Sequence, residues 1–359
     1  MKAIITAGGR GTRLRPLTFT NNKHLIPVAN KPIIEYAIDT IKKTGISDIG
    51  IIYNKNLPEL KTFIESKNNF GIDITYIHQP SPIGLADCVR VSKNFLGENK
   101  FIMFLGDNMI ASDIKDLKET FENDRTYQSY LLLTTVPDPQ RFGVPVFNKK
   151  GELIGIEEKP ENPKTEFAVT GIYFYDSHVF EAFEGKDQIT PSKRGELEIS
   201  DLHQYLLDHG YKIKTYNVTG WWKDTGKIND LLLAQRLILE KHHKFSINSK
   251  TKNTVIEGEV EIKKGCKIEN SFIRGPLTIG ENSKIISSYI GPFSSIGNNC
   301  TITKSEIENS IILDGSSIID VNYRIDSSLI GKNSKITKKG KVPKSISMMV
   351  GDMADIQLI

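Results

Sequence analysis

The sequence predicts an α/β protein in which a mostly parallel sheet, covered by helices, is followed by a parallel β-helix. Over the first two-thirds of the chain, short apolar runs alternate with amphipathic helical patterns, as in a sheet covered on both faces. After residue 250 the apolar residues recur every six positions, sometimes every five, which fits neither a helix nor an alternating strand. We therefore expect two domains, over residues 1–245 and 246–359.

The first domain begins with the apolar run Ala3–Ile5, which predicts a buried strand. Further buried strands are expected at the apolar runs 48–53, 72–77 and 101–105. Helices are expected at the amphipathic segments 32–44, 84–96 and 227–243. Strands and helices in this order favour a sheet whose strands run mostly in parallel.

The second domain is predicted from its isoleucines. They occupy the repeated position at Ile256, Ile262, Ile268, Ile273, Ile279, Ile285, Ile290, Ile296, Ile302, Ile307, Ile312 and Ile318, and the pattern continues at Ile325, Ile330 and Ile336. Three hexapeptides form one triangular coil of roughly 18 residues with the isoleucines stacked inside. The tail, residues 344–359, is expected to form a cap or an interface strand.

Composition excludes several classes of protein. The net charge is only +4 with no long basic block, so a nucleic-acid partner is not expected. The three cysteines, Cys88, Cys266 and Cys300, are too few and too widely spaced for a disulfide framework or a zinc ribbon. We expect buried thiols in a reducing compartment, and no apolar run long enough to span a membrane. These observations favour a cytoplasmic protein.

The strongest chemical signal is the loop 8–18, Gly-Gly-Arg-Gly-Thr-Arg-Leu-Arg-Pro-Leu-Thr, which directly follows the first strand. Its glycines let backbone N–H groups approach a phosphate, and its arginines suit bidentate phosphate contacts. A Walker A loop is excluded because no Gly-Lys-Ser/Thr follows, and a dinucleotide fingerprint is excluded by Leu14. The loop therefore predicts a nucleotide-phosphate site of another class, the alternative being a surface turn.

Two carboxylates are candidates for binding Mg²⁺. Asp107 follows the strand 101–105, at the end of the sheet where ligands bind. Asp224 lies in the segment Trp-Trp-Lys-Asp-Thr-Gly, between residues 221 and 226. The alternatives are a turn or helix cap at Asp107 and an N-cap of the helix 227–243 at Asp224.

Four further side chains could bind the substrates. Lys159 could contact a phosphate and Glu158 could accept sugar hydroxyls, although both could equally form a solvated strand end. Lys23 could neutralise a triphosphate or be an exposed loop lysine. Gln79 offers a paired donor and acceptor that match the edge of a pyrimidine, or it belongs to an ordinary strand-to-helix connection.

These motifs in this order resemble the sugar-1-phosphate nucleotidyltransferases, most closely the long-form, thymidylyl-transferring members with a β-helix extension. The matching segments are residues 8–18, 23–27, 79–86, 105–108, 142–144, 157–160, 195–201 and 220–226. The resemblance is dense over residues 1–245, and the extension matches in kind. It implies a Rossmann-like sheet followed by a left-handed β-helix.

The resemblance also implies roles for individual residues. It implies nucleotide binding at Gly8, Gly9, Gly11, Thr12, Arg13, Gln79, Pro82, Gly84 and Asp107, with the pyrimidine read at Gln79, Pro82 and Gly84. It implies binding of the sugar phosphate at Asn108, Gly143, Glu158, Lys159 and Thr170. It implies Mg²⁺ ligands at Asp107 and Asp224, and catalytic cations at Arg13, Lys23 and Lys159. The chain departs from the family pattern at Thr6, His24 and Asp87.

The implied reaction is transfer of a nucleotidyl group from dTTP to glucose-1-phosphate, giving dTDP-glucose and pyrophosphate. A preference for UTP, or a broad specificity, is the alternative. A β-helix acyltransferase is disfavoured because all seven histidines lie at or before His243. A non-catalytic regulatory subunit is disfavoured because the phosphate and metal residues are present. A homo-oligomer assembled through the β-helix is expected.

Overall fold

The structure, a computed structural model, describes residues 1–9, 11–19, 22–241, 246–338, 348, 350 and 352–357. The chain packs into two compact units, one formed by Met1–Arg10 with Ile34–Asp224 and the other by Gly11–Ile33 with Thr225–Ile359. The division into domains at residue 245 remains a prediction. Half of the tail 344–359, predicted as a cap or an interface strand, lies outside the described residues.

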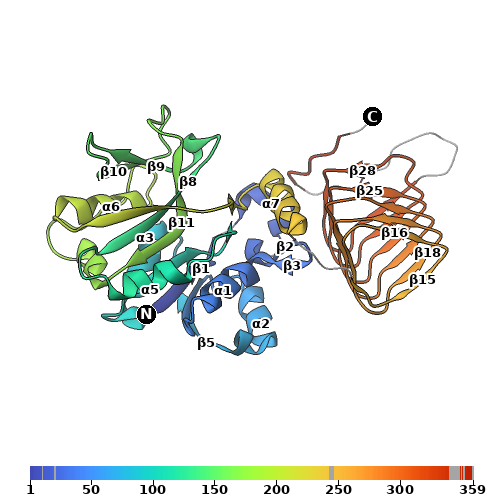
Figure 1. Ribbon diagram of the computed structural model, residues 1–359, viewed down its shortest axis with the longest axis horizontal. Helices are drawn as coiled ribbons and strands as arrows, with labels where there is room; N and C mark the ends of the chain where they lie inside the picture. The colour runs from blue at the N-terminus through green and yellow to red at the C-terminus, as the bar shows by residue number, and fades with distance from the viewer. Residues whose placement is uncertain are drawn as a thin grey trace. The chain divides into compact units, whose positions relative to one another are not determined.

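The first unit is built on a seven-stranded sheet with the order β12-β8-β11-β6-β1-β4-β5 (Figure 1). The strands are β1 (Lys2–Thr6), β4 (Asp48–Tyr53), β5 (Asp73–His78), β6 (Phe101–Leu105), β8 (Ser129–Thr135), β11 (Phe167–Tyr175) and β12 (Ile213–Asn217). All neighbours pair in parallel except β11, which is antiparallel to both β6 and β8. The mostly parallel sheet is confirmed, and so are the buried strands β1, β4 and β6. The prediction of a buried strand over 72–77 is wrong, because β5 is an edge strand in which only Ile77 is buried.

Helices cover this sheet and bury an apolar core against it. They are α1 (Ile33–Lys43), α2 (Glu59–Ser66), α3 (Leu85–Val91), α4 (Lys93–Leu96), α5 (Lys115–Asn123) and α6 (Ile199–Asp208). The helix predicted over 84–96 is divided at Ser92, whose Oγ donates to the Cys88 carbonyl oxygen at 2.7 Å. A serine bonded in this way to the preceding turn competes with the regular helix and bends it.

Two small antiparallel sheets and three short 3₁₀ segments complete the first unit. One sheet pairs β7 (Asn108–Ile110) with β13 (Trp222–Asp224), and the other pairs β9 (Gly143–Phe147) with β10 (Leu153–Glu158). The 3₁₀ segments are η4 (Asn68–Gly71), η5 (Pro139–Arg141) and η6 (Ser177–Phe183). Since only Gly106 and Asp107 separate β6 from β7, the first of these sheets lies at the carboxyl end of a parallel strand.

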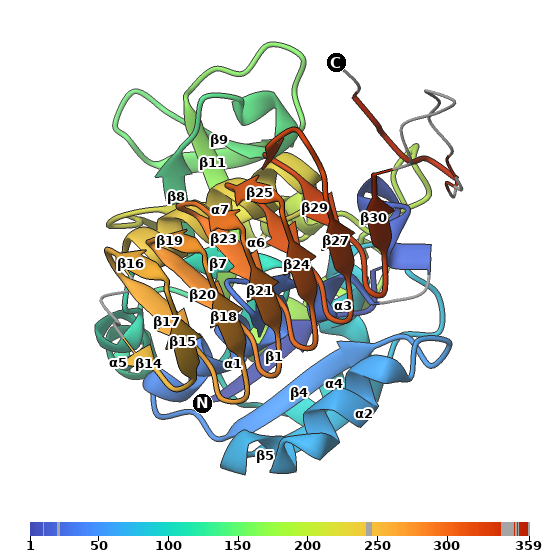
Figure 2. The same ribbon diagram turned by 90° about the vertical axis from the view of Figure 1, so that its right-hand side faces the viewer.

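The second unit contains a β-helix of three parallel sheets (Figure 2). The first sheet consists of β14 (Ser246–Ile247), β17 (Val260–Ile262), β20 (Leu277–Ile279), β23 (Ser294–Ile296), β26 (Ile311–Ile312) and β29 (Leu329–Ile330). The second consists of β15 (Lys250–Lys252), β18 (Lys267–Glu269), β21 (Lys284–Ile286), β24 (Thr301–Thr303), β27 (Ser317–Ile319) and β30 (Lys335–Thr337). The third consists of β16 (Val255–Glu257), β19 (Phe272–Arg274), β22 (Tyr289–Ile290), β25 (Glu306–Glu308) and β28 (Ile325–Asp326).

The isoleucines of the repeat stack inside this β-helix, as the six-residue period predicts. In the first sheet, Ile262 is in register with Ile279 and Ile279 with Ile296, so most coils are 17 residues long. The expected 18-residue spacing occurs near the end of the β-helix, where Ile307 pairs with Ile325, Ile312 with Ile330 and Ile318 with Ile336. The usual coil is shorter because one of its three sides carries five residues in place of six.

The other elements of the second unit are helix α7 (Ile228–Glu240), the short hairpin of β2 (Pro27–Val28) and β3 (Lys31–Pro32), and three 3₁₀ turns. The turns are η1 (Thr12–Leu14), η2 (Leu17–Phe19) and η3 (Lys23–Leu25). Helix α7 confirms the prediction over 227–243, of which residues 242 and 243 lie outside the described residues. None of the helices in the described ranges has the length and apolar character of a membrane-spanning segment.

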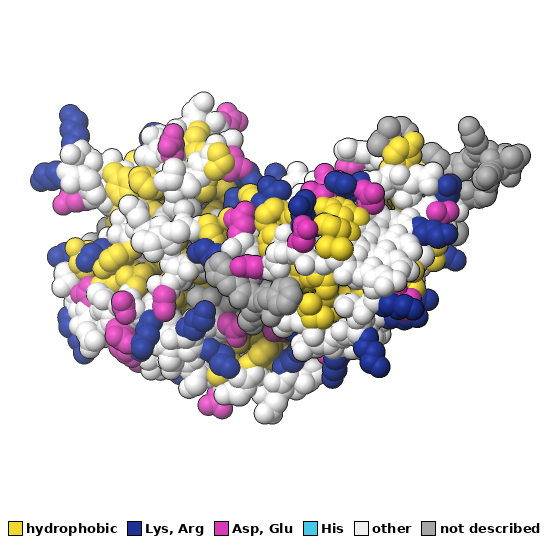
Figure 3. Space-filling view, turned by 45° about the vertical axis from the view of Figure 1, so that its right-hand side comes forward, with side chains coloured by type: hydrophobic (Ala, Val, Ile, Leu, Met, Phe, Trp, Pro, Cys, Tyr) yellow, Lys and Arg dark blue, Asp and Glu magenta, His cyan; other side chains and the backbone are white. Residues whose placement is uncertain are grey.

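Charged side chains of both signs are interspersed on the face shown in Figure 3. No broad region of one sign stands out there, which agrees with the small net charge of +4.

Candidate functional site

Two candidate metal-binding carboxylates are brought together at the carboxyl end of β6. The chain turns at Gly106 and Asp107 and enters β7, whose first residue, Asn108, lies directly opposite Asp224 on β13. Asp107 is therefore one residue from the position that faces Asp224. Both acidic residues are half-buried. Lys227, and not Asp224, occupies the N-cap position of α7, so the capping alternative for Asp224 is wrong.

Asn108 holds this corner of the site in place. Its Oδ1 accepts hydrogen bonds from the indole Nε1 of Trp222 at 2.7 Å and from the backbone N–H of Gly171 at 3.2 Å. Its Nδ2 donates to Oδ1 of Asp107 at 3.1 Å. The buried amide thus connects three elements and orients a candidate metal ligand. That Asn108 also binds the sugar phosphate remains a prediction.

Gly171, on β11, must be a glycine because the corner is tightly packed. A Cβ atom there would lie 2.6 Å from side-chain carbons of Leu105 and 2.7 Å from Oδ1 of Asn108. Its neighbour Thr170 is fully buried, and its hydroxyl has no hydrogen-bond partner within the described ranges. An unpaired buried hydroxyl is a group that a bound ligand could satisfy.

Three of the predicted sugar-phosphate residues, Gly143, Glu158 and Lys159, lie on or directly after the sheet of β9 and β10. Gly143 is opposite Glu158, and a Cβ atom on Gly143 would come within 3.1 Å of Ile156. Lys159 follows directly, with a positive φ of 47°, and its exposed ammonium group contacts the Glu158 carboxylate. This backbone conformation is unusual for lysine.

A hollow of about 420 Å³ lies beside Lys159. Its lining includes two basic residues that the sequence analysis did not select, Lys193 and Arg194. The Arg194 guanidinium is 2.9 Å from Glu198 and 3.7 Å from Glu158. Both basic residues directly precede the matching segment 195–201, so extending that segment by two positions would have found them.

Carboxylates balance the charge of this hollow. Burial raises the pKa of Asp201, and the carboxylates of Glu198 and Glu158 raise it further. Glu198 also accepts a hydrogen bond from Ser192 Oγ at 2.7 Å. The hollow therefore combines fixed cations with acceptor oxygens, a combination suited to a phosphorylated sugar.

The two small sheets are joined by a ring contact. Phe142, just before β9, packs edge-on against Trp222 on β13 with ring centroids 5.2 Å apart. The acidic corner and the cation-lined hollow thus belong to one packed region of the first unit.

Gln79 is buried, and its amide orientation is fixed. Its Nε2 donates to the Asp87 carboxylate at 2.8 Å, and Asp87 is held in turn by Arg90. Because a carboxylate can only accept, the amide nitrogen must point to Asp87. The opposite atom, Oε1, lies 3.5 Å from the position of a Cβ atom on Gly8 and so faces the glycine loop.

The neighbouring predicted residues shape the surroundings of Gln79 through the backbone. Gly84 has φ near 120°, and a Cβ atom there would lie 2.3 Å from the Leu197 carbonyl oxygen, so only glycine fits. Pro82 is exposed and Gly9 is half-buried. Gly8 and Gly9 follow β1, whose end is held where the Ala7 N–H donates to the Ile52 carbonyl.

The remaining predicted residues, Gly11, Thr12, Arg13 and Lys23, belong to the second unit. Gly11 has φ of 60°, and a Cβ atom there would lie 2.9 Å from Cβ of Lys23. Thr18 Oγ1 donates to the Gly11 carbonyl at 2.7 Å. The loop therefore holds Lys23 against Gly11, while Thr12 and Arg13 are exposed.

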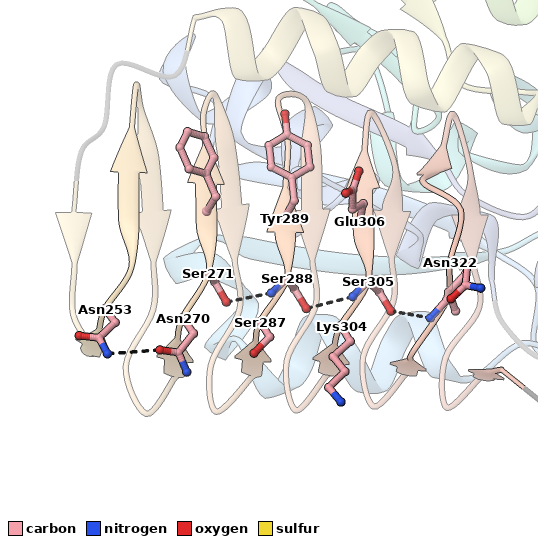
Figure 4. A pocket seen from close by; sticks show the side chains of 12 residues that line it. Asn253, Asn270, Ser271, Ser287, Ser288, Tyr289, Lys304, Ser305, Glu306 and Asn322 are labelled. Carbon is pink, nitrogen blue, oxygen red and sulfur yellow. Dashed lines mark hydrogen bonds between the residues drawn. The ribbon is translucent and has the colours of Figure 1, made fainter.

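A larger hollow, of about 740 Å³, lies on the β-helix (Figure 4). Ser271, Ser288 and Ser305 form a ladder there, in which each Oγ accepts a backbone N–H from the next coil at 3.2–3.3 Å. Residues at the neighbouring corner, such as Asn270 and Lys304, have φ near 50°. The lining is thus explained by the turns of the β-helix, and the cations and acids of the first unit form the better site.

Comparison with known proteins points to one family. Residues 2–241 match the family model described as nucleotidyl transferase. The chain is 40% identical over 358 residues to a glucose-1-phosphate thymidylyltransferase of Streptomyces griseus, covering 100% of this chain and 99% of that protein.

Two solved structures are also similar. One is a Bacillus anthracis protein assigned as a glucose-1-phosphate thymidylyltransferase, in complex with sucrose. It shares 39% identity with a TM-score of 0.61, over 69% of this chain and 98% of that one. The other is a UDP-glucose pyrophosphorylase complexed with UDP-glucose, at 22% identity and a TM-score of 0.59, over 67% of this chain and 98% of that one. At that identity the second likeness shows the fold alone.

Proposed function

The chain belongs to the nucleotidyl transferase family, and we propose that it transfers a thymidylyl group from dTTP to glucose-1-phosphate, giving dTDP-glucose and pyrophosphate. The observation that carries this proposal is that one unit holds both an acidic corner, Asp107 and Asp224, and a hollow lined by Lys159 and Arg194, on two small sheets linked by the ring contact of Phe142 with Trp222. One region thereby offers ligands for a cation and counter-charges for a sugar phosphate. The relative from Streptomyces griseus, similar over its whole length, carries the name of this activity.

The acidic corner fits a magnesium ion. No group of three or more His, Cys, Asp or Glu side chains in the described ranges could hold a metal by itself. Mg²⁺ in nucleotide enzymes is commonly held by one or two carboxylates together with substrate phosphates and water. Asp107 and Asp224 would supply those carboxylates, and the ion would neutralise charge on the triphosphate.

The remaining chemistry is positioning and charge neutralisation. An oxygen of the sugar phosphate forms a bond to the α-phosphorus of dTTP, while the bond from that phosphorus to the bridging oxygen breaks and pyrophosphate leaves. The attacking phosphate is already anionic, so no general base or covalent intermediate is needed. Lys159 and Arg194 would hold the attacking phosphate, and Arg13 and Lys23 would bind the triphosphate.

Gln79 would read the base. Thymine and uracil carry an imide N–H between two carbonyls, whereas cytosine has an acceptor nitrogen at that place. The fixed Oε1 of Gln79 can accept the imide hydrogen, because Asp87 holds the amide nitrogen on the other side. Since the imide is common to both bases, UTP or a broad nucleotide range is the second candidate for this reaction.

A steady-state comparison tests the proposal. Pyrophosphate release is measured with dTTP or UTP against glucose-1-phosphate and other hexose-1-phosphates, and the products are identified by mass. We expect dTDP-glucose to form with the highest kcat/KM. A higher kcat/KM with UTP would favour the second candidate, and no sugar nucleotide from any pair would contradict the assignment.

Location and assembly form a separate part of the proposal. The three cysteines are buried thiols without disulfides, which agrees with a reducing compartment such as the cytoplasm. We also propose a homo-oligomer assembled through the β-helix, because two of its three sheets carry strands with exposed residues through which such coils can pack. Light scattering of the full chain tests this, and a monomer at micromolar concentration would contradict it.

A further inference from the structure

One sheet of the β-helix is covered on its outer face. In the strands β20, β23 and β26 every residue is buried. In strands of the other two sheets, such as β21 and β19, buried residues alternate with more exposed ones. Thr278 and Ser295, the middle residues of β20 and β23, are buried although they alternate with inward-pointing isoleucines. Helix α7 and the hairpin of β2 and β3 lie against this sheet, as the following contacts show.

Gln235 of α7 binds the β-helix and the hairpin at the same time. Its side chain is 0% exposed. Nε2 donates to the carbonyl oxygens of Phe293 at 2.8 Å and Ser310 at 3.1 Å, and Oε1 accepts from Ser295 Oγ at 2.6 Å. The same Oε1 accepts the backbone N–H of Ala29 at 3.2 Å, so one buried amide ties the hairpin turn to two coils.

Asn30 makes a second, independent connection. It occupies the hairpin turn with φ of 61°, and its Nδ2 donates to the Ile296 carbonyl at 2.7 Å. Farther along the β-helix, Leu17 lies 3.4 Å from the position of a Cβ atom on Gly331. The segment between Gly11 and Ile33 is therefore supported by the β-helix at two places.

This support continues to a residue that would bind phosphate. The Ile33 N–H donates to the Ile26 carbonyl and the Ile26 N–H donates to the Lys23 carbonyl, each at 3.2 Å. Cβ of Lys23 is held against Gly11. Hydrogen bonds and the short chain segment from Asn30 to Ile33 thus connect Ile296 of the β-helix to Lys23.

We propose that the β-helix is a positioning element for the triphosphate-binding loop, and that Asn30 and Gln235 are the positioning residues through which it acts. The inference rests on the proposed function, because it requires that Lys23 and Arg13 bind the nucleotide. It assigns to the β-helix an influence on nucleotide affinity. The residues expected to bind the sugar phosphate lie in the other unit, so their affinity does not depend on this support.

Substitution of Asn30 tests the proposal. Asn30→Gly keeps the positive φ and removes the amide, and Asn30→Asp keeps the shape but cannot donate to the Ile296 carbonyl. In both variants we expect the KM for dTTP to rise roughly tenfold, because the hydrogen bond to the buried Ile296 carbonyl is lost. The KM for glucose-1-phosphate should change by less than about twofold, because the lost hydrogen bond supports only the segment that is expected to bind the nucleotide.

Asn253→Gly is the matched control. Asn253 also has a positive φ, of 48°, but it is exposed, and its Nδ2 donates to Oδ1 of the Asn270 side chain at 3.3 Å. Its kinetics should equal those of the wild type. An unchanged KM for dTTP in both Asn30 variants, or an equal rise in both KM values, would overturn the inference. A wild-type chain that forms no dTDP-glucose would instead overturn the proposed function.

Discussion

Single side chains in the first unit hold the residues that are expected to meet the substrates. Asn108 orients Asp107 through a 3.1 Å hydrogen bond, and Asp87 fixes the Gln79 amide at 2.8 Å. These supporting residues are buried, whereas Lys159 and Arg13 are exposed. Buried hydrogen bonds therefore fix the orientation of Asp107 and Gln79, while exposed side chains supply the positive charge.

Replacing either candidate metal ligand should nearly abolish turnover while the fold remains. Asp107→Asn and Asp224→Asn each remove one anionic oxygen ligand, and we expect a loss in kcat of at least about 100-fold. Asp116→Asn, at an exposed carboxylate in the first turn of α5, is the control. Activity is measured at saturating Mg²⁺, with circular dichroism to verify folding. Full activity in either variant would refute the assignment of that ligand.

Lys159→Ala should weaken binding of the sugar phosphate selectively. The ammonium group lies at the hollow and not at the glycine loop, so the KM for glucose-1-phosphate should rise roughly tenfold or more. The KM for dTTP should stay within about twofold of the wild type. Lys164→Ala, which removes an exposed lysine paired with Glu157, serves as the control. A defect confined to dTTP would show that Lys159 acts on the other substrate.

Gln79→Ala should relax the choice of base. Without Oε1 the enzyme loses its acceptor for the imide hydrogen, so the ratio of kcat/KM for dTTP over dCTP should fall by roughly tenfold or more. The comparison uses glucose-1-phosphate as the common acceptor. If the ratio is the same in the variant and the wild type, Gln79 does not read the base.

At the scale of elements, the sequence predicts strands better than helix ends and side-chain partners. The apolar runs 48–53 and 101–105 are β4 and β6, because burial on both faces leaves an almost continuous apolar pattern. The division at Ser92 depends on one side-chain hydrogen bond, which no period reveals. The orientation of Gln79 likewise depends on where packing places Asp87.

Helix α6 carries a buried histidine that makes stability depend on pH. Burial lowers the pKa of His203 from 6.5 to about 3, and its Nε2 lies 2.6 Å from the Tyr175 hydroxyl. As the pH falls below 6.5 the unfolded chain binds a proton that the folded chain excludes. The free energy of unfolding should therefore fall with decreasing pH by up to about 1.4 kcal/mol per unit, and this contribution is fully present above pH 6.5.

His203→Gln isolates this effect, because glutamine can still bond the Tyr175 hydroxyl but does not titrate in this range. Urea unfolding is measured at about pH 7 and about pH 5, and the wild type should lose more stability than the variant by about 1–2 kcal/mol. Equal losses in the two proteins would mean that His203 titrates alike in the folded and unfolded states.

At the scale of the whole molecule, the two kinds of element were predictable but their division into units was not. The six-residue period predicts the β-helix, whose core of isoleucines is confirmed. That residues 11–33 pack with it depends on contacts such as that between Asn30 and Ile296, which are 266 positions apart. Local periodicity carries no information about partners at that distance.

The central claim is that this chain transfers the nucleotidyl group in one in-line step, by positioning and neutralising charge without a covalent enzyme intermediate. The stereochemistry at the α-phosphorus tests it most directly. The enzyme is given dTTP made chiral by one sulfur on the α-phosphate, with glucose-1-phosphate, and the configuration of the product is determined by phosphorus NMR. A single in-line displacement gives inversion, which we predict. Retention would reveal two successive displacements and contradict the account.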